Sequence, residues 1–264
     1  MRLRKYTALM RSQIKVDLAY TAWYWASMFS VTMRLFILYF FWQAVYANKT
    51  DVSGISLSTM LTYAILATMI DQFRGGAGRD LARMIKQGAI AIELLRPYHL
   101  LDKLLAQDIG SKVSILFRSI LPLVLVSILF IGVDRPQSWL AGLAFVGSVL
   151  FAVLLATLID LLVGIFAFYT VNIWGLSVLQ DAVITIMSGA IVPLTLFPDW
   201  FQTISLYLPF ASLVYVPVAI YTGEIGACGI LQALLVQIGW LIGFFVLLRI
   251  TFARAIRKVT VFGG

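Results

Sequence analysis

The sequence predicts an all-α membrane protein with a single domain, residues 1–264, built almost entirely from transmembrane helices. Hydrophobic residues make up 61% of the chain and charged residues only 12%, whereas soluble domains average roughly 45–50% and about 25%. Charge-free segments approach or exceed the roughly 18–20 apolar residues that cross a bilayer as a helix. These segments are 52–70, 136–159, 161–180, 200–223 and 225–248. The composition therefore excludes a soluble enzyme.

A surface helix is expected at the N-terminus, over residues 1–22. Apolar and basic side chains recur there at helical spacing on separate stripes, a pattern typical of amphipathic helices in the membrane interface. The stripes are Leu3, Tyr6, Met10 and Ile14, and Arg4, Arg11 and Lys15. No convincing small-residue cleavage site follows, so we expect mature protein here instead of a removed signal peptide.

Six transmembrane helices are expected along the rest of the chain. Their ranges are 23–46, 56–73, 113–133, 139–165, 173–192 and 228–249. The first begins at Trp23, Tyr24 and Trp25, whose aromatic rings favour the headgroup layer. Residues 74–112 form the longest polar stretch, and we expect a loop there that is large enough to bind a partner protein.

The segment 193–223 is apolar enough to cross the membrane, but it holds four of the seven prolines. Proline breaks the helical hydrogen-bond ladder, which makes an uninterrupted lipid-facing helix costly. If this segment instead enters from the outside and returns, 17 of the 20 basic residues lie on one side: five near the N-terminus, eight between Arg74 and Arg118, and four near the C-terminus. Basic residues favour the cytoplasmic side. We therefore predict a re-entrant helical hairpin between the fifth and sixth spans, with both termini cytoplasmic.

Three ionisable residues, Arg34, Asp160 and Asp181, are expected inside the cytoplasmic half of the membrane. Charges in this position are expensive, so we expect them to face protein or water and to pair with one another. They could form a proton or substrate site, or a structural salt bridge; the structural interpretation is the more economical. Asp71 is expected at the interface and carries little weight.

Several chemistries lack the residues that they require. The chain has one cysteine and one histidine, too few for an internal disulfide or a histidine-rich metal site. We find no phosphate-binding loop, no serine-hydrolase elbow and no zinc-binding histidine pair in the sequence. The formal net charge of +8 is interpreted as a determinant of membrane orientation, and no nucleic acid is expected as a partner.

A short amphipathic helix is expected within residues 85–99. Apolar and charged side chains alternate with helical spacing there, and a proline ends the pattern. The residues that define it are Ile85, Lys86, Ile90, Ile92, Glu93, Leu94, Leu95, Arg96 and Pro97. It is interpreted as a docking element for a partner or, alternatively, as a plain surface helix.

Taken together, these features resemble one family of membrane transporters. Gly88 and the sequence LeuLeuArgPro at 94–97 lie in the cytoplasmic loop, and SerGlyAlaIleValProLeuThrLeuPheProAspTrpPhe spans 188–201. LeuProPheAlaSer at 208–212 and ProValAlaIleTyrThrGly at 217–223 follow. The whole chain resembles the membrane subunit of the ATP-binding-cassette (ABC) type-2, exporter-class permeases, in particular a bacterial branch with subunits of about this length.

The resemblance implies a function, partners and site residues. A coupling helix over residues 85–96 would insert into a separate ATPase subunit, present in two copies, which binds ATP and magnesium; no cofactor is expected on this chain. A second permease subunit, expected to be non-identical, would complete the pathway in the bacterial inner membrane. The implied coupling residues are Ile85, Lys86, Gly88, Ile90, Glu93, Leu94, Arg96 and Pro97. The implied residues of the outer gate are Pro193, Pro198, Pro209, Phe210 and Pro217.

Export of a hydrophobic or amphipathic cargo is the function that the resemblance and the few polar groups of the spans favour. Two alternatives stay open at this point. A proton-coupled secondary transporter would use Asp160 and Asp181 as its relay and would need no ATPase. A lipid-modifying membrane enzyme would need a cluster of nucleophile, base or metal ligands at one depth, for which the sequence offers only isolated carboxylates.

Overall fold

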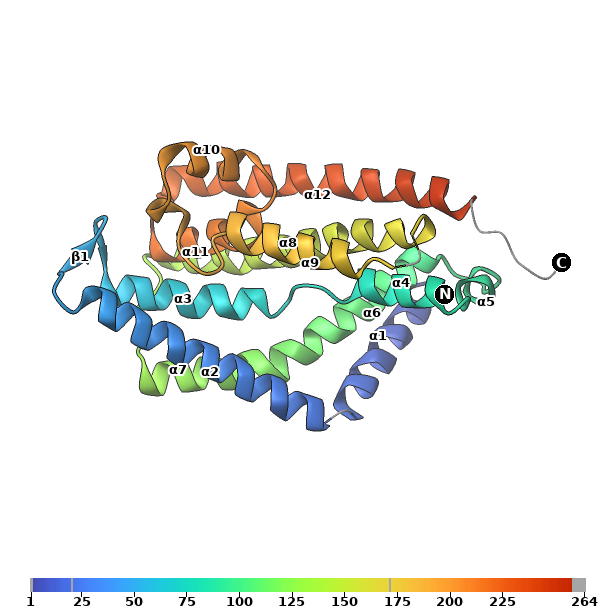
Figure 1. Ribbon diagram of the computed structural model, residues 1–264, viewed down its shortest axis with the longest axis horizontal. Helices are drawn as coiled ribbons and strands as arrows, with labels where there is room; N and C mark the ends of the chain where they lie inside the picture. The colour runs from blue at the N-terminus through green and yellow to red at the C-terminus, as the bar shows by residue number, and fades with distance from the viewer. Residues whose placement is uncertain (1, 20, 171, 258–264) are drawn as a thin grey trace.

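A computed structural model describes residues 2–19, 21–170 and 172–257 of the chain as an elongated bundle of helices (Figure 1). Lys258 of the predicted basic tail and the side chains of Leu3 and Trp23 lie outside the described part. The α-helices are α1 (Arg2–Ala19), α2 (Thr21–Tyr46), α3 (Leu57–Asp71), α4 (Ala77–Lys86), α5 (Ile90–Leu94), α6 (Leu100–Ile115), α7 (Leu121–Phe130), α8 (Trp139–Ile165), α9 (Trp174–Met187), α10 (Asp199–Tyr207), α11 (Tyr215–Thr222) and α12 (Ala227–Ile256). A hairpin of β1 (Asp51–Val52) and β2 (Ile55–Ser56) joins α2 to α3, with Asp51 opposite Ser56.

Four stretches of helix are long and apolar enough to cross a membrane within the described residues. They are Tyr24–Tyr46, Leu100–Phe130, Trp139–Phe168 and Ala227–Ile256. Two further apolar helices, α3 and α9, have 15 and 14 residues. At roughly 1.5 Å per residue, each is about 21–22 Å long, shorter than the roughly 30 Å hydrocarbon core.

The helix that contains the third predicted span begins earlier than the sequence suggested. One continuous helix runs from Leu100 to Phe130, with a π-helical turn, η1 (Leu116–Ile120), between α6 and α7. We expected a polar loop up to residue 112 because Lys103, Asp108 and Lys112 interrupt the apolar pattern. All three residues are buried, and each basic side chain forms an ion pair, so their charges do not interrupt the helix.

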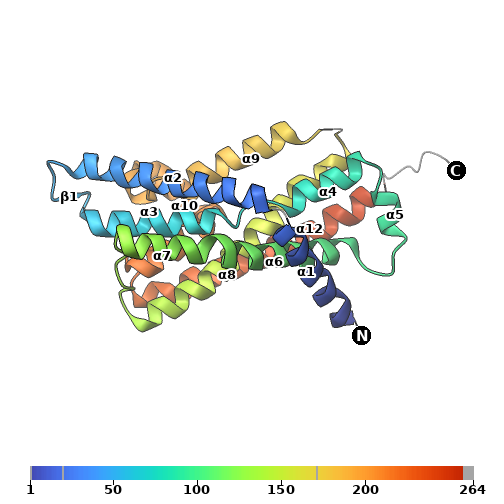
Figure 2. The same ribbon diagram turned by 90° about the horizontal axis from the view of Figure 1, so that it is seen from below.

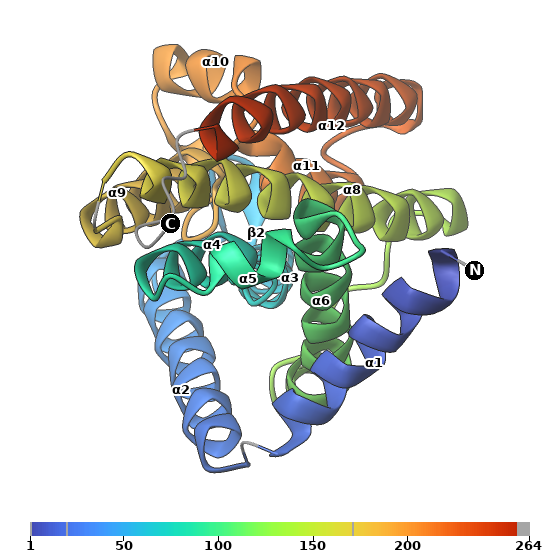
Figure 3. The same ribbon diagram turned by 90° about the vertical axis from the view of Figure 1, so that its right-hand side faces the viewer.

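The two ends of the molecule differ in character. The β-hairpin, α10 and α11 lie at one end, and α4, α5 and the last turns of α12 lie at the other (Figures 1 and 2). Hydrogen bonds between Gln137 and the Tyr221 carbonyl, at 3.3 Å, and between the Tyr221 hydroxyl and the Asp134 carbonyl, at 2.9 Å, attach the α7–α8 loop to α11 at the hairpin end. Seen along the long axis, α1 packs against α6, and α2 leads away from the C-terminal end of α1 at a wide angle (Figure 3).

The segment 193–223 is a chain of short helices, as expected from its prolines. Pro193 precedes η3 (Leu194–Leu196), Pro198 precedes α10, and Pro209 lies just before η4 (Ala211–Leu213). Pro217 is the third residue of α11, where its missing N–H costs no helical hydrogen bond. Each proline therefore lies just before a helix or in its first turn, where it causes no kink.

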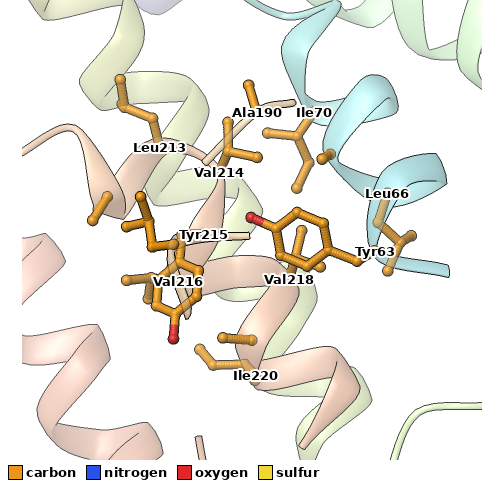
Figure 4. Packing of buried hydrophobic residues seen from close by; sticks show 14 of the residues in the cluster. Tyr63, Leu66, Ile70, Ala190, Leu213, Val214, Tyr215, Val216, Val218 and Ile220 are labelled. Carbon is orange, nitrogen blue, oxygen red and sulfur yellow. The ribbon is translucent and has the colours of Figure 1, made fainter. Parts of the chain in front are cut away.

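The largest part of the core forms where α3, α8 and α11 meet. Eleven consecutive residues of α3, from Met60 to Ile70, are buried. Figure 4 shows the Tyr63 ring extending from α3 toward α11, near Val218. Its hydroxyl donates a hydrogen bond of 2.7 Å to the Gly189 carbonyl. The broken segment is therefore an integral part of the helical core.

Candidate functional site

The predicted coupling segment, 85–96, is two helices and not one. Ile85 and Lys86 form the last turn of α4, and a left-handed Gly88, with φ of 72°, ends that helix before α5 begins. Glycine adopts this conformation without the steric cost that other residues incur. The expectation of a single helix was wrong. Apolar and charged residues keep their helical spacing on both sides of Gly88, so the spacing does not reveal the turn there.

Side chains within the segment anchor α5 to the rest of the protein. Ile90 is buried, and the Glu93 carboxylate accepts hydrogen bonds from Lys103 at 2.6 Å and Tyr98 at 2.8 Å. Arg96 lies 3.7 Å from the other Glu93 oxygen. Burial raises the pKa of Glu93, but the hydrogen bonds and the nearby positive charges outweigh it and hold this pKa below its ordinary value. Glu93 is therefore a structural anchor of the loop.

Apolar side chains project from the same segment into the surroundings. Leu95 is 87% exposed and Ile92 is 64% exposed; Leu94 and Pro97 are exposed beside them. These residues form the apolar tip, which we define as Ile92, Leu94, Leu95 and Pro97. It lies at the far end of the bundle, past α4 (Figure 1).

Helix α4 contacts α8 backbone to backbone. A Cβ atom on Gly78 would lie 1.9 Å from the Asp160 carbonyl oxygen, and one on Gly164 would lie 2.5 Å from the Gly78 carbonyl oxygen. The buried Asp160 carboxylate accepts a 2.7 Å hydrogen bond from the Gly78 N–H in the first turn of α4. This is the position where a helix has unpaired N–H groups and favours negative charge. Asp160 is thus an N-terminal cap for α4, supplied by α8.

The three predicted intramembrane charges do not pair with one another. Arg34 on α2 lies 2.8 Å from Asp71, which also pairs with Arg74 at 2.5 Å. Arg74 donates to the Thr185 hydroxyl at 3.0 Å, which connects α2, α3 and α9. The partner of Arg34 is therefore Asp71, a residue that we expected at the membrane interface and did not count among the candidate site residues. A hydropathy pattern could not identify Asp71 as the partner of Arg34, because the two residues lie on different helices. The i,i+3 spacing of Asp71 and Arg74, by contrast, was visible in the sequence.

Asp181 occupies a separate place on α9. Its carboxylate is 47% exposed and lies 3.8 Å from Arg79 on α4. Both side chains face a groove between α4 and α9 that is also lined by Arg83, Lys86 and Trp174. The sequence analysis singled out Asp181 as a charge in an apolar segment, but it did not identify Arg79 as its partner.

Sequence reasoning missed a buried polar cluster between α6 and α8. The Lys112 ammonium donates to Asp108 and to the Thr157 hydroxyl, each at 2.6 Å. The Thr157 hydroxyl in turn donates to the same Asp108 oxygen at 2.6 Å. Asp108 and Lys112 are spaced i,i+4, the usual spacing of helical ion pairs, but this signal has meaning only once residues 100–115 are known to be helical.

The predicted gate residues are spread along the broken segment at the hairpin end. Pro193, Pro209 and Pro217 are buried, Pro198 is exposed, and Phe210 packs against the core around α11. A pocket of about 460 Å³ lies beside them, with Tyr63, Thr195 and Glu224 among its lining residues. The structure thus brings the gate residues into one region without gathering their side chains into a single cluster.

Comparison with known proteins gives one result that fits this architecture. Residues 32–263 match the family model described as ABC-2 family transporter protein. No curated protein matches the chain. Because the matched segment covers far more than half of a mostly helical chain with long apolar helices, the protein belongs to the ABC-2 transporter family and is a multi-pass membrane permease component of an ABC transporter.

Proposed function

We propose that this chain forms half of a translocation pathway and exports a hydrophobic or amphipathic cargo, driven by a separate ATPase subunit. Two ATPase copies would bind ATP and magnesium, and a second permease subunit, which we propose to be non-identical, would form the other half. In this proposal the six-span topology places α5 and both termini in the cytoplasm of a bacterium and the β-hairpin outside its inner membrane.

The apolar tip is the observation that supports ATPase docking most strongly. Large apolar side chains exposed at a water-facing end cost solvation free energy unless a partner covers them. Burying one leucine side chain contributes roughly 1.5–3 kcal/mol, or about a tenfold or greater gain in affinity. Leu95 is more exposed than Ile92 and Leu94, and we propose that it is the main ATPase contact.

The packing of α4 supports a route for coupling. Force applied to α5 would reach α4 across the short turn at Gly88, and α4 is fixed to α8 through Gly78, Gly164 and Asp160. Since close-packed protein interiors have low compressibility and transmit strain, α8 would follow α4. We propose that this movement reaches the hairpin end through the core that α8 shares with α11.

Co-purification tests the proposal. The chain, tagged at its C-terminus, would be expressed with its genomic neighbours, and the ATP-hydrolysing subunit that co-purifies would be quantified. We expect Ile92→Asp together with Leu95→Asp to abolish recovery of the ATPase. The control Tyr207→Asp, whose site on α10 has a similar exposure of 79%, should leave recovery unchanged. An ATPase-free preparation of the wild type would contradict the proposal.

The proton-coupled alternative finds little support in the geometry. Asp160 is buried and bound to the first turn of α4, whereas Asp181 is half-exposed on α9 beside Arg79. A relay requires groups that can exchange a proton along a connected path. Each aspartate instead has its own partner on α4.

A further inference from the structure

The groove between α4 and α9 has two chemically different walls. It has a volume of about 340 Å³ and lies at the end of the bundle that carries α5. Residues of α4 and of the first half of α9 line it, and the two helices lie near one another in Figures 2 and 3. The composition of each wall indicates what kind of molecule would fit between them.

The α4 wall is basic. Arg79, Arg83 and Lys86 follow one another at i, i+4 and i+7, so they share one face of the helix. The ion pairs of the two arginines are exposed to solvent, with Arg79 at 3.8 Å from Asp181 and Arg83 at 3.3 Å from Asp80. Exposed pairs of this kind contribute little free energy. A bound anion could therefore compete for these cations.

The wall at the start of α9 is mainly apolar, and its polar residues are Asn172, Ser177 and Asp181. Ile173, Trp174 and Val178 line it, and Trp174 is 73% exposed. Tryptophan is enriched where the hydrocarbon core meets the headgroups, because its ring is apolar and its N–H is polar. Of the residues lining the groove, Asp181 is the one carboxylate. Three cations opposite an apolar wall complement a molecule with an anionic head and an apolar tail.

We propose that this groove binds one anionic amphiphile, with a phosphate-like head against α4 and its tail along Trp174 on α9. A soluble anion would leave the apolar wall without a function, and an acidic protein surface would not enter a groove of this size. The occupant is either a bilayer phospholipid or the transported cargo; the cargo assignment alone rests on the proposed function.

Tryptophan quenching by brominated lipids tests binding without any ATPase, so its result does not depend on the proposed function. The full chain would be placed in nanodiscs that contain brominated phosphatidylglycerol or brominated phosphatidylcholine at equal mole fraction. The Trp174 signal is the difference between wild type and Trp174→Phe. We expect stronger quenching by phosphatidylglycerol, and loss of this preference in Arg79→Gln, Arg83→Gln and Lys86→Gln combined.

A matched control separates the groove from general surface charge. Arg4→Gln, Arg11→Gln and Lys15→Gln combined removes three cations from α1, and we expect it to retain the preference. Asp181→Asn, which removes the groove's carboxylate, should strengthen it. Equal quenching by the two lipids, or equal loss in the two triple variants, would overturn the proposal.

Competition identifies the occupant. Dodecyl phosphate, a single-chain anionic amphiphile, should displace brominated phosphatidylglycerol if the groove can load cargo, whereas resistance to it would assign the groove to two-chain bilayer lipids. Glycerol phosphate carries the head without the tail. Displacement by glycerol phosphate at the same concentration would contradict recognition of an amphiphile.

Discussion

Gly164 and Gly147 lie on the same helix, but only Gly164 has a neighbour where a side chain would be. A Cβ on Gly164 would meet the Gly78 backbone at 2.5 Å, and one on Gly147 would meet nothing within 4 Å. We expect Gly164→Ala to lower the stability of the purified protein by about 1–3 kcal/mol through overpacking, and Gly147→Ala to be neutral or mildly stabilising. Thermal unfolding in one detergent checks both variants, and equal melting temperatures would contradict the close α4–α8 contact.

Asp160 distinguishes a helix cap from a proton carrier. Asparagine still accepts the hydrogen bond from the Gly78 N–H, so we expect Asp160→Asn to retain most transport activity. Leucine leaves that N–H unpaired, which costs about 1–3 kcal/mol, so Asp160→Leu should be destabilised. Transport and thermal stability measured on both variants check this prediction. Complete loss of transport in a stably folded Asp160→Asn would favour the proton relay instead.

At the scale of elements, apolar patterns located the helices whose few charges lie near one end. The segment predicted at 139–165 is α8, Trp139–Ile165, and the one at 228–249 lies within α12, Ala227–Ile256. The early turns of α6 were missed because pairing across helices, as between Lys103 and Glu93, is not visible in a local pattern. The division at Gly88 was missed because a turn of this size does not interrupt hydrophobic periodicity.

The α5 loop should loosen in acid because Glu93 holds it. The pKa of Glu93 is lowered by its contacts, so the carboxylate stabilises the loop above the ordinary glutamate range, near pH 4.3. This stabilisation is lost as pH falls through the lowered pKa. Hydrogen exchange of residues 87–99, corrected for intrinsic rates, should rise in acid for the wild type. Glu93→Gln should show fast exchange already at neutral pH; unchanged protection there would contradict the anchor.

At the scale of the whole molecule, Cys228 reports on orientation. It is the single cysteine of the sequence, and it is exposed at the start of α12, near the hairpin end. We expect a membrane-impermeant maleimide to label it in spheroplasts. In a Cys228→Ser background, Leu95→Cys should be labelled only after permeabilisation. Labelling of Leu95→Cys in intact spheroplasts would contradict the proposed orientation in the membrane.

Site-specific photocrosslinking tests the central claim most directly, namely that the apolar tip docks on an ATPase. A photoreactive phenylalanine analogue would replace Leu95 or, as the matched control, Tyr207 at the other end of the molecule. Our account predicts a crosslink from position 95 to the ATP-hydrolysing subunit and none from position 207. A crosslink from 207 alone, or from neither position in a complex that hydrolyses ATP, would contradict it.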